Sequence, residues 1–261
     1  MGVINVSPES FHAGSVYRGD DAVIAAALGM VEAGAALIDV GARSSAPYLE
    51  TAVSEAEETQ RLVRAVSALA AKLPVPVSAD TCRPSVARAA LEAGARVVND
   101  VSALAEPALA RVAAEHDAGL IVMAAPGRGR TVDAPVATVT RILRTALATA
   151  REAGVPVERV VLDPGIGFFR DADIAWHAWD VAVLAGLPAL AGLGRPLCVG
   201  VSRKSFVGAI TGRDDPAARL SGSLAATAAA VLGGAALIRT HDVAETVDAV
   251  RVTERVRRAA R

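Results

Sequence analysis

Short apolar segments recur along the chain, and each one ends in polar residues or glycine. They are rich in Val, Ile and Leu, and their hydrophobicity is nearly continuous, which is typical of parallel strands buried on both faces. The eight predicted strands are Gly2–Val6, Ala36–Gly41, Val75–Asp80, Arg96–Val101, Gly119–Ala124, Val160–Asp163, Leu197–Ser202 and Ala236–Thr240.

Alanine-rich stretches of helical period separate these segments. Clear examples are Asp20–Ala33, Ser54–Leu73, Pro84–Ala93 and Thr138–Ala153. Eight strand–helix repeats within about 250 residues favour an α/β fold of the TIM (β/α)8 barrel type. The alternative is a doubly wound open sheet, which usually has fewer strands. No linker or low-complexity tract interrupts the pattern, so we expect a single domain over residues 1–261.

Glycine occurs just before several of the predicted strands. The sequence EAGA occurs at Glu32–Ala35 and again at Glu92–Ala95. Glycine after a helix is typical of a left-handed C-terminal cap. We therefore expect these segments to be helix-to-strand turns with a structural role.

Residues with functional groups follow every predicted strand. The active site of a TIM barrel forms where the strands meet their following loops. Any one of these residues alone is compatible with a helix cap, a turn or core packing. Eight strands that all end this way predict a common site instead. The candidates are Asn5, Arg43, Ser45, Asp80, Asn99, Met123, Asp163, Ser202, Lys204, Arg239 and His241.

The chemistry of these candidates suits a flat heterocycle and an anion. Carboxylates, an amide and a cation at Asp80, Asn99, Asp163 and Lys204 match a ring that carries both donors and acceptors. The planar guanidinium of Arg239 suits stacking on such a ring or binding a phosphate. The chain contains no HExxH, Walker or GxGxxG motif and no Ser-His-Asp set at a familiar spacing. Nucleophilic catalysis by a side chain therefore has little support.

Composition excludes several classes of function. The 27 basic and 28 acidic residues give a net charge of −1, so the bulk charge does not favour nucleic-acid binding. Aromatic residues make up 3%, which disfavours a base-stacking platform. Cys82 and Cys198 suit a reducing compartment. With neither a membrane span nor a signal peptide recognisable, we expect a cytoplasmic protein that does not bind a membrane.

In their order and spacing, these segments resemble the dihydropteroate synthase family, the folate-pathway enzymes with a pterin-binding TIM barrel. The resemblance runs from Met1 to about Val252. It rests on GVINVSPESF (Gly2–Phe11), SADT (Ser78–Thr81), VVNDVSAL (Val97–Leu104), LDPGIGF (Leu162–Phe168), VGVSRKSFVG (Val199–Gly208), GSLAA (Gly222–Ala226) and IRTHDVAET (Ile238–Thr246).

The resemblance implies a reaction and a role for each matching residue. An aryl amine would displace diphosphate from 6-hydroxymethyl-7,8-dihydropterin diphosphate, with Mg²⁺ as cofactor. The family commonly forms homodimers. The pterin would be held at Asp80, Asn99, Asp163 and Lys204, with Arg239 against the ring, and Met123 and Phe168 would complete the substrate site. Asn5 would bind Mg²⁺, and Arg239 and His241 would hold the diphosphate. Ser202 would lie by the amine.

Two loops depart from the family pattern. GARSSAPY (Gly41–Tyr48) has Ala46 where the family carries an arginine, keeps a hydroxyl at Ser45, and adds Arg43. MAAPGRG (Met123–Gly129) lacks the usual histidine. These loops look more like divergent synthases associated with tetrahydromethanopterin, whose amine is a ribofuranosyl-aminobenzene phosphate. Candidate ligands for that phosphate are Arg43, Arg128 and Arg130.

The identity of the amine therefore stays open between 4-aminobenzoate and the ribosylated phosphate. Two other functions are alternatives. A corrinoid-linked methyltransferase shares the pterin-binding barrel, but it would have no use for the SRKS and RTHD elements at Ser202–Ser205 and Arg239–Asp242. A non-catalytic pterin-binding protein would explain the altered loops.

Overall fold

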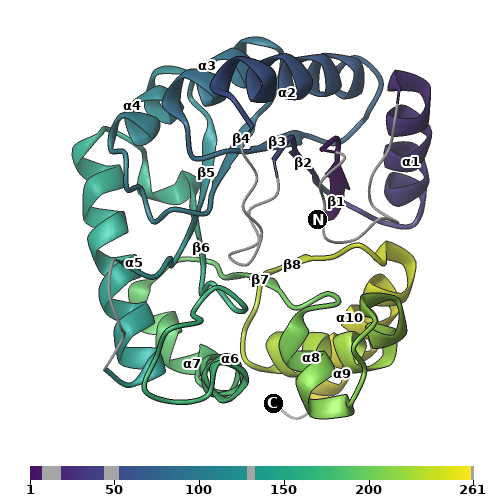
Figure 1. Ribbon diagram of the computed structural model, residues 1–261, viewed down its shortest axis with the longest axis vertical. Coiled ribbons are helices and arrows are strands. Elements are labelled where there is room, and N and C mark those ends of the chain that lie inside the picture. The colour runs from purple at the N-terminus through teal and green to yellow at the C-terminus, as the bar shows by residue number, and fades with distance from the viewer. Residues whose placement is uncertain (8–18, 44–52, 128–132, 260–261) are drawn as a thin grey trace.

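A ring of parallel strands surrounded by helices makes up the computed structural model, which describes residues 1–7, 19–43, 53–127 and 133–259 (Figure 1). All eight predicted strands are present, with ends that differ by no more than a few residues. They are β1 (Gly2–Asn5), β2 (Ile38–Gly41), β3 (Val77–Asp80), β4 (Val97–Asp100), β5 (Gly119–Met123), β6 (Val160–Asp163), β7 (Cys198–Gly200) and β8 (Leu237–Arg239).

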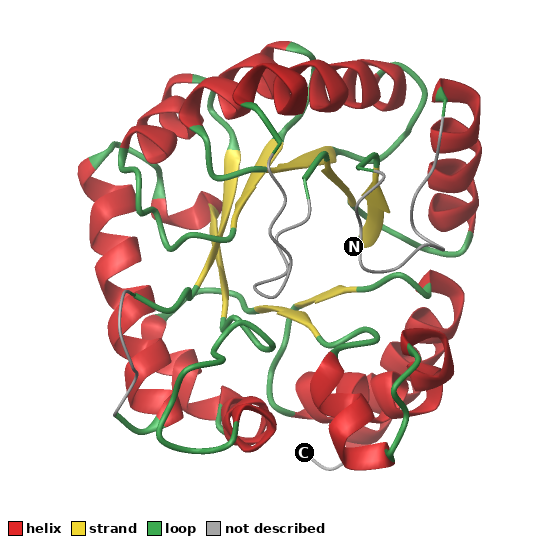
Figure 2. Ribbon diagram, in the orientation of Figure 1, coloured by secondary structure: helices red, strands yellow, loops and turns green. Residues whose placement is uncertain are grey.

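The ring closes through backbone contacts at two seams. Strands β1 to β6 form one continuous parallel sheet, and β7 pairs with β8. Parallel bridges join Leu162 to Leu197 and Gly2 to Thr240. At the second seam the Val3 N–H donates to the Thr240 carbonyl over 3.1 Å. Figure 2 shows the resulting barrel, which confirms the predicted fold over the open-sheet alternative.

Helices cover the outside of the barrel. They are α1 (Asp20–Glu32), α2 (Glu55–Ala70), α3 (Pro84–Glu92), α4 (Ala108–Glu115), α5 (Pro135–Glu152), α6 (Trp176–Ala185), α7 (Leu187–Leu190), α8 (Ser205–Thr211), α9 (Leu220–Leu232) and α10 (Val243–Ala259). Short 3₁₀ turns occur at Val157–Arg159, Ala191–Leu193 and Pro216–Arg219. None of the helices in the described ranges is by itself long and apolar enough to cross a membrane; one bent pair, α6 with Leu187–Leu193, reaches that length and composition jointly.

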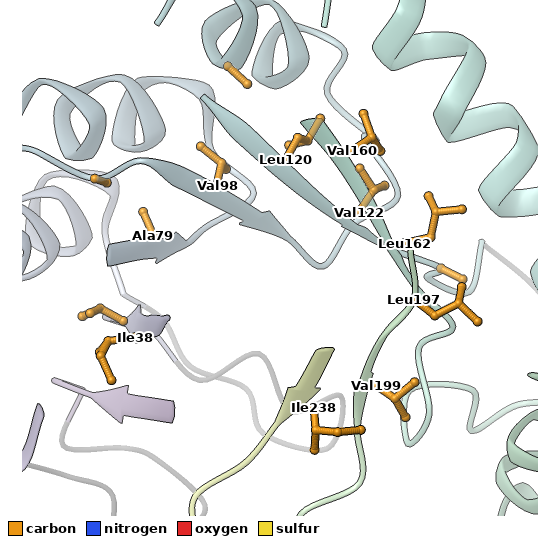
Figure 3. Close-up of a cluster of buried hydrophobic side chains, with 14 of the residues drawn as sticks. Ile38, Ala79, Val98, Leu120, Val122, Val160, Leu162, Leu197, Val199 and Ile238 are labelled. Carbon is orange, nitrogen blue, oxygen red and sulfur yellow. The ribbon is translucent and has the colours of Figure 1, made fainter. Parts of the chain in front are cut away.

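Successive side chains along each strand point alternately outward and inward, and they form two hydrophobic cores. One set, which includes Val98, Leu120 and Val160, packs between the strands and the helices (Figure 3). A smaller cluster around Leu37 and Ile121 forms from the alternate positions. Successive strand residues point to opposite faces, so a residue two places after a member of the smaller cluster also points to the inside of the barrel. The inward positions near the carboxyl ends are Asp39, Asn99, Met123, Asp163 and Arg239.

The EAGA segments form the predicted turns. Gly34 and Gly94 have φ of 104° and 114°, in the left-handed region. At the second turn, the Ala95 N–H donates to the Ala90 carbonyl and the Gly94 N–H donates to the Leu91 carbonyl, both over 3.0 Å. This pair of bonds is the Schellman pattern, which satisfies carbonyls at a helix C-terminus.

We expect Gly94→Ala to destabilise the protein by about 1–3 kcal/mol, because an L-residue is strained at this φ. A Cβ at position 94 would also lie 2.8 Å from the Ala70 Cβ. Gly29→Ala is the matched control: Gly29 lies inside α1 with open space around it, so alanine should gain about 0.5–1 kcal/mol. Denaturant unfolding measures both changes, and equal effects would contradict the turn assignment.

Candidate active site

The carboxyl ends of the strands bring the sequence-predicted residues to one mouth of the barrel. Strand register pairs Asp80 with Asn99, Met123 with Asp163, and Gly200 with Arg239. The side chains of Asn99, Met123, Asp163 and Ser202 are buried. Ser45, Arg128 and Arg130 lie outside the described residues.

Arg239 binds two carboxylates from other strands. Its Nε donates to Asp39 Oδ2 over 2.8 Å, and its Nη2 donates to Asp80 Oδ2 over 2.9 Å. The Asn99 amide donates to the same Asp39 oxygen over 3.2 Å. One guanidinium therefore joins β8 to β2 and β3. It orients Asp80 directly and Asn99 through Asp39, and both are predicted pterin-binding residues.

The shared guanidinium leaves an excess of negative charge at this point. Burial raises the pKa of Asp80 to about 7, the Asp39 charge adds to that increase, and Arg239 offsets only part of it. The neutral form of Asp80 is therefore more favourable here than it would be for a carboxyl group in water. A ligand that donates hydrogen bonds to Asp80 would favour its ionised form.

Asp163 and Lys204 face the loop that follows β6. Asp163 Oδ1 accepts a hydrogen bond from the Gly165 N–H over 2.8 Å, and burial raises the Asp163 pKa. The Lys204 Nζ lies 4.5 Å from the centroid of the Phe168 ring. Burial lowers the Lys204 pKa to about 8, although Asp163 favours its charged form. Lys204 and Phe168 are thus in contact, as a shared substrate site requires.

The loop needs glycine where it passes the end of β5. Gly165 has a φ of 71°, and a Cβ there would lie 2.0 Å from the Ala124 carbonyl oxygen. That distance leaves no space for any side chain. The close approach of the two loops keeps Asp163 and Met123 at neighbouring strand ends.

Side-chain hydrogen bonds connect the loops that follow β7 and β8. Ser202 Oγ lies 3.0 Å from His241 Nδ1 and accepts from the His241 backbone N–H over 3.2 Å. Beside them, Arg203 donates to both oxygens of Asp242 over 2.9 and 2.5 Å. The backbone φ of Arg203 is 56°, a strained value for a residue with a side chain. These bonds hold the Ser202 and His241 turns against one another.

Arg43 points to a buried glutamate. Its Nε lies 3.6 Å from the Glu58 carboxylate. Glu58 also accepts from Arg83 over 2.8 Å and from the Thr81 hydroxyl over 2.6 Å. Two guanidinium groups thus face one carboxylate, which leaves one net positive charge in this corner.

Asn5 lies beside Gly41, which has no side chain to fill the space between strands. A Cβ at Gly41 would lie 3.3 Å from Asn5 Oδ1 and 3.7 Å from Asp80 Oδ2, so both oxygens border the same point. Within the described ranges, no three His, Cys, Asp or Glu side chains group closely enough to hold a metal by themselves. Oxygen donors of this kind suit Mg²⁺, which usually takes one or two protein ligands and completes its shell with water and phosphate.

Comparison with known proteins identifies the family. Residues 1–241 match the model of the pterin-binding enzymes. The dihydropteroate synthase of Synechocystis is 40% identical over 93% of this chain and 84% of its own length. The chain belongs to the dihydropteroate synthase family. A Xanthomonas albilineans dihydropteroate synthase structure with 4-aminobenzoic acid is 40% identical, with a TM-score of 0.88 over 98% of this chain and 91% of that one.

A second Xanthomonas albilineans structure, a complex with 7,8-dihydropteroate, is 38% identical with a TM-score of 0.85 over 98% of this chain and 92% of that one. This likeness confirms both the TIM barrel and the predicted family. The roles assigned to individual residues stay predictions, which the geometry above makes specific.

Sequence reasoning missed several residues that shape this site. Asp39 sits inside an apolar strand, and a lone acid in such a segment was the signal that could have marked it. Glu58 carries no such signal, because its partners are distant in sequence. Arg203 and Asp242 lie in the SRKS and RTHD elements that the sequence marks, but their contact with each other forms only in the folded barrel.

The raised Asp80 pKa makes a pH-dependent prediction. The folded state binds this proton more tightly than the unfolded state does, so wild-type stability should fall as pH rises from about 4 through 7. Asp80→Asn removes that loss. Between about pH 4 and pH 7, the free energy of unfolding of Asp80→Asn relative to wild type should rise by on the order of 2–4 kcal/mol. This range follows from about 1.4 kcal/mol for each unit by which the Asp80 pKa is raised.

Urea unfolding at several pH values measures this difference. Asp133→Asn is the control, because Asp133 is a surface carboxylate with 59% of its side chain exposed. We expect its difference from wild type to be flat with pH. An equally flat profile for Asp80→Asn would refute the arrangement of two carboxylates around one guanidinium.

Proposed function

We propose that this chain condenses 6-hydroxymethyl-7,8-dihydropterin diphosphate with 4-aminobenzoate and releases diphosphate. Family membership supports a transferase that acts on the pterin methyl group. The observation that carries the proposal is that Asp80, Asn99, Asp163 and Lys204 gather, buried or partly buried, at one mouth of the barrel. This set offers acceptors and donors to the edge of a single flat ring.

The pterin ring would use the two carboxylates as acceptors. Its amino group and ring N–H groups are donors, which suit ionised Asp80 and Asp163. Lys204 would donate to an acceptor of the ring, with Phe168 beneath its ammonium group. As diphosphate leaves, positive charge grows on the pterin methylene, and the same carboxylates would stabilise it.

The leaving group would lie by the ends of β1, β7 and β8. Arg239 and His241 would stabilise the negative charge that grows on diphosphate during bond cleavage. Ser202 keeps the His241 ring in place through its contact with Nδ1. The amine is already a nucleophile, so this chemistry requires no strongly basic side chain.

Mg²⁺ fits this part of the site as a companion of the diphosphate. Asn5 Oδ1 would supply the protein oxygen, because Asp80 Oδ2 nearby already accepts from Arg239. When bound, the ion would neutralise charge on the leaving group.

One feature favours 4-aminobenzoate over the ribosylated phosphate as the amine. A relative of 40% identity has been solved with 4-aminobenzoic acid. Arg43, the described candidate for binding a sugar phosphate, shares Glu58 with Arg83, so one positive charge in this corner is left for an anion. The tetrahydromethanopterin branch therefore becomes the alternative outcome of the test.

The methyltransferase alternative gives the SRKS and RTHD elements no role toward a diphosphate. The two elements pack on each other through the Ser202–His241 and Arg203–Asp242 contacts, which keeps the proposed diphosphate ligand His241 in place. A non-catalytic pterin-binding protein stays an alternative outcome of the test. A homodimer and a cytoplasmic location, both implied by the resemblance, are further proposals. Light scattering after size-exclusion chromatography and fractionation of cells test them.

The function is tested by supplying purified protein with pterin diphosphate, Mg²⁺ and each amine in turn. We expect dihydropteroate and diphosphate, with a kcat/KM for 4-aminobenzoate at least about tenfold above that for the ribosylated phosphate. A chelator should slow the reaction. The opposite preference, lost in Arg43→Ala, would assign the chain to the other branch.

Pterin binding without diphosphate release would instead make the chain a binding protein. Methyl transfer from a methylated pterin to a corrinoid would make it a methyltransferase. Either result would contradict the proposed condensation.

A further inference from the structure

A buried carboxylate lies behind the loop that follows β6. Asp180, on α6, is 1% exposed. Its Oδ1 accepts a hydrogen bond from the Gly167 N–H over 2.7 Å. Its Oδ2 is buried and accepts no hydrogen bond from the part of the chain that the structure describes. A charge buried this deeply is costly, so its position calls for a physical cause.

The peptide that Asp180 holds is in contact with Lys204. A Cβ on Gly167 would lie 2.9 Å from Lys204 Cδ and 3.3 Å from Nζ, so the lysine side chain lies directly on this glycine. Phe168, the next residue, carries the ring that faces the Lys204 ammonium group. Asp180 therefore fixes the surface on which Lys204 rests.

We propose that Asp180 is a positioning residue for Lys204. It anchors Gly167 and Phe168 against the lysine side chain, and its negative charge adds to that of Asp163 in favouring the ammonium form. The proposal extends the proposed function, in which Lys204 binds the pterin.

The charges around Lys204 set the expected effect. Asp163 from β6 and Asp180 from α6 favour its charged form, while burial, Arg239 from β8 and Arg170 oppose it. Burial also raises the pKa of Asp180 to about 6, with Lys204, Arg170 and His177 acting in the opposite direction. Between about pH 6 and pH 8 the carboxylate and the ammonium are then both charged. Loss of the Asp180 charge should lower the Lys204 pKa.

The loop has a second anchor on the same helix. Phe169 stacks on Trp179, with ring centroids 4.9 Å apart and planes 21° from parallel. This contact should keep the loop in place when only the charge of Asp180 is removed. Asp180→Asn keeps the shape of the side chain and an oxygen that accepts from Gly167, so it isolates the electrostatic part of the role.

The composition of the chain makes a direct measurement simple. Lys72 and Lys204 are its two lysines, and Lys72 is exposed. Protein labelled with ¹³C-lysine therefore gives two sets of side-chain NMR signals, one of them an internal reference. The chemical shift of each Cε, followed against pH in the unliganded protein, reports the titration of each ammonium group.

We expect Lys204 to titrate near pH 8 in wild type and lower by about half a pH unit or more in Asp180→Asn. Asp171→Asn, an exposed change in the same loop, should leave both midpoints unchanged. Asp180→Glu should restore the midpoint toward wild type. Calorimetry with a pterin at pH 8 should show a severalfold loss of affinity in Asp180→Asn and none in Asp171→Asn.

An unchanged Lys204 midpoint in folded Asp180→Asn would overturn the proposal. If that variant does not fold, Asp180→Ser removes the charge with a smaller polar side chain, and the same criterion applies. The titration uses no substrate. A wild-type protein without synthase activity would refute the proposed function and leave the link between Asp180 and Lys204 standing.

Discussion

The mouth of this barrel depends on one partly buried guanidinium shared by two carboxylates. Arg239 is 200 residues from Asp39 and 159 residues from Asp80 along the chain, yet it bonds to both. A guanidinium that has lost most of its contact with water needs such partners. The arrangement is possible because the Gly2–Thr240 bridge closes the ring and places β8 next to β1, from which the long Arg239 side chain reaches β2 and β3.

The same strand geometry separates stability from chemistry. Inward positions low in the barrel are apolar, as at Leu37 and Ile121, and form a small core. Two residues beyond Leu37, Val161 and Leu237, the inward positions are Asp39, Asp163 and Arg239. The period of two along a strand therefore places polar groups at the carboxyl ends without disturbing the apolar layer that packs against the helices.

Most of the fold could be predicted from the sequence, because near-continuous apolar strands and helical periods are local signals. The candidate site could be predicted for the same reason, because most of its residues lie at the ends of those strands or directly after them. The sequence could not reveal contacts between distant segments. Examples are the ion pair between Arg43 and Glu58 and the hydrogen bond that Asp180, on a helix, accepts from the Gly167 N–H. Asp39 was hidden inside a strand assigned wholly to the core.

These contacts also explain why several buried ionisable groups are retained. Burial raises the pKa of Asp80 and Asp163 and lowers that of Lys204, so their charged forms are less favourable there than in water. A ligand that pairs with them recovers part of that free energy. Groups held in this way are typical of sites preorganised for a polar substrate.

The central claim is that this set of side chains binds a pterin, and Asp163 tests it most directly. Calorimetry with a pterin analogue should show about a 10- to 100-fold loss of affinity in Asp163→Asn, equivalent to roughly 1.5–3 kcal/mol for one charge-assisted hydrogen bond. The asparagine still has an oxygen to accept from Gly165, so the loop should persist. Asp133→Asn, at the surface, should bind as wild type does. Unchanged affinity in folded Asp163→Asn would contradict the account.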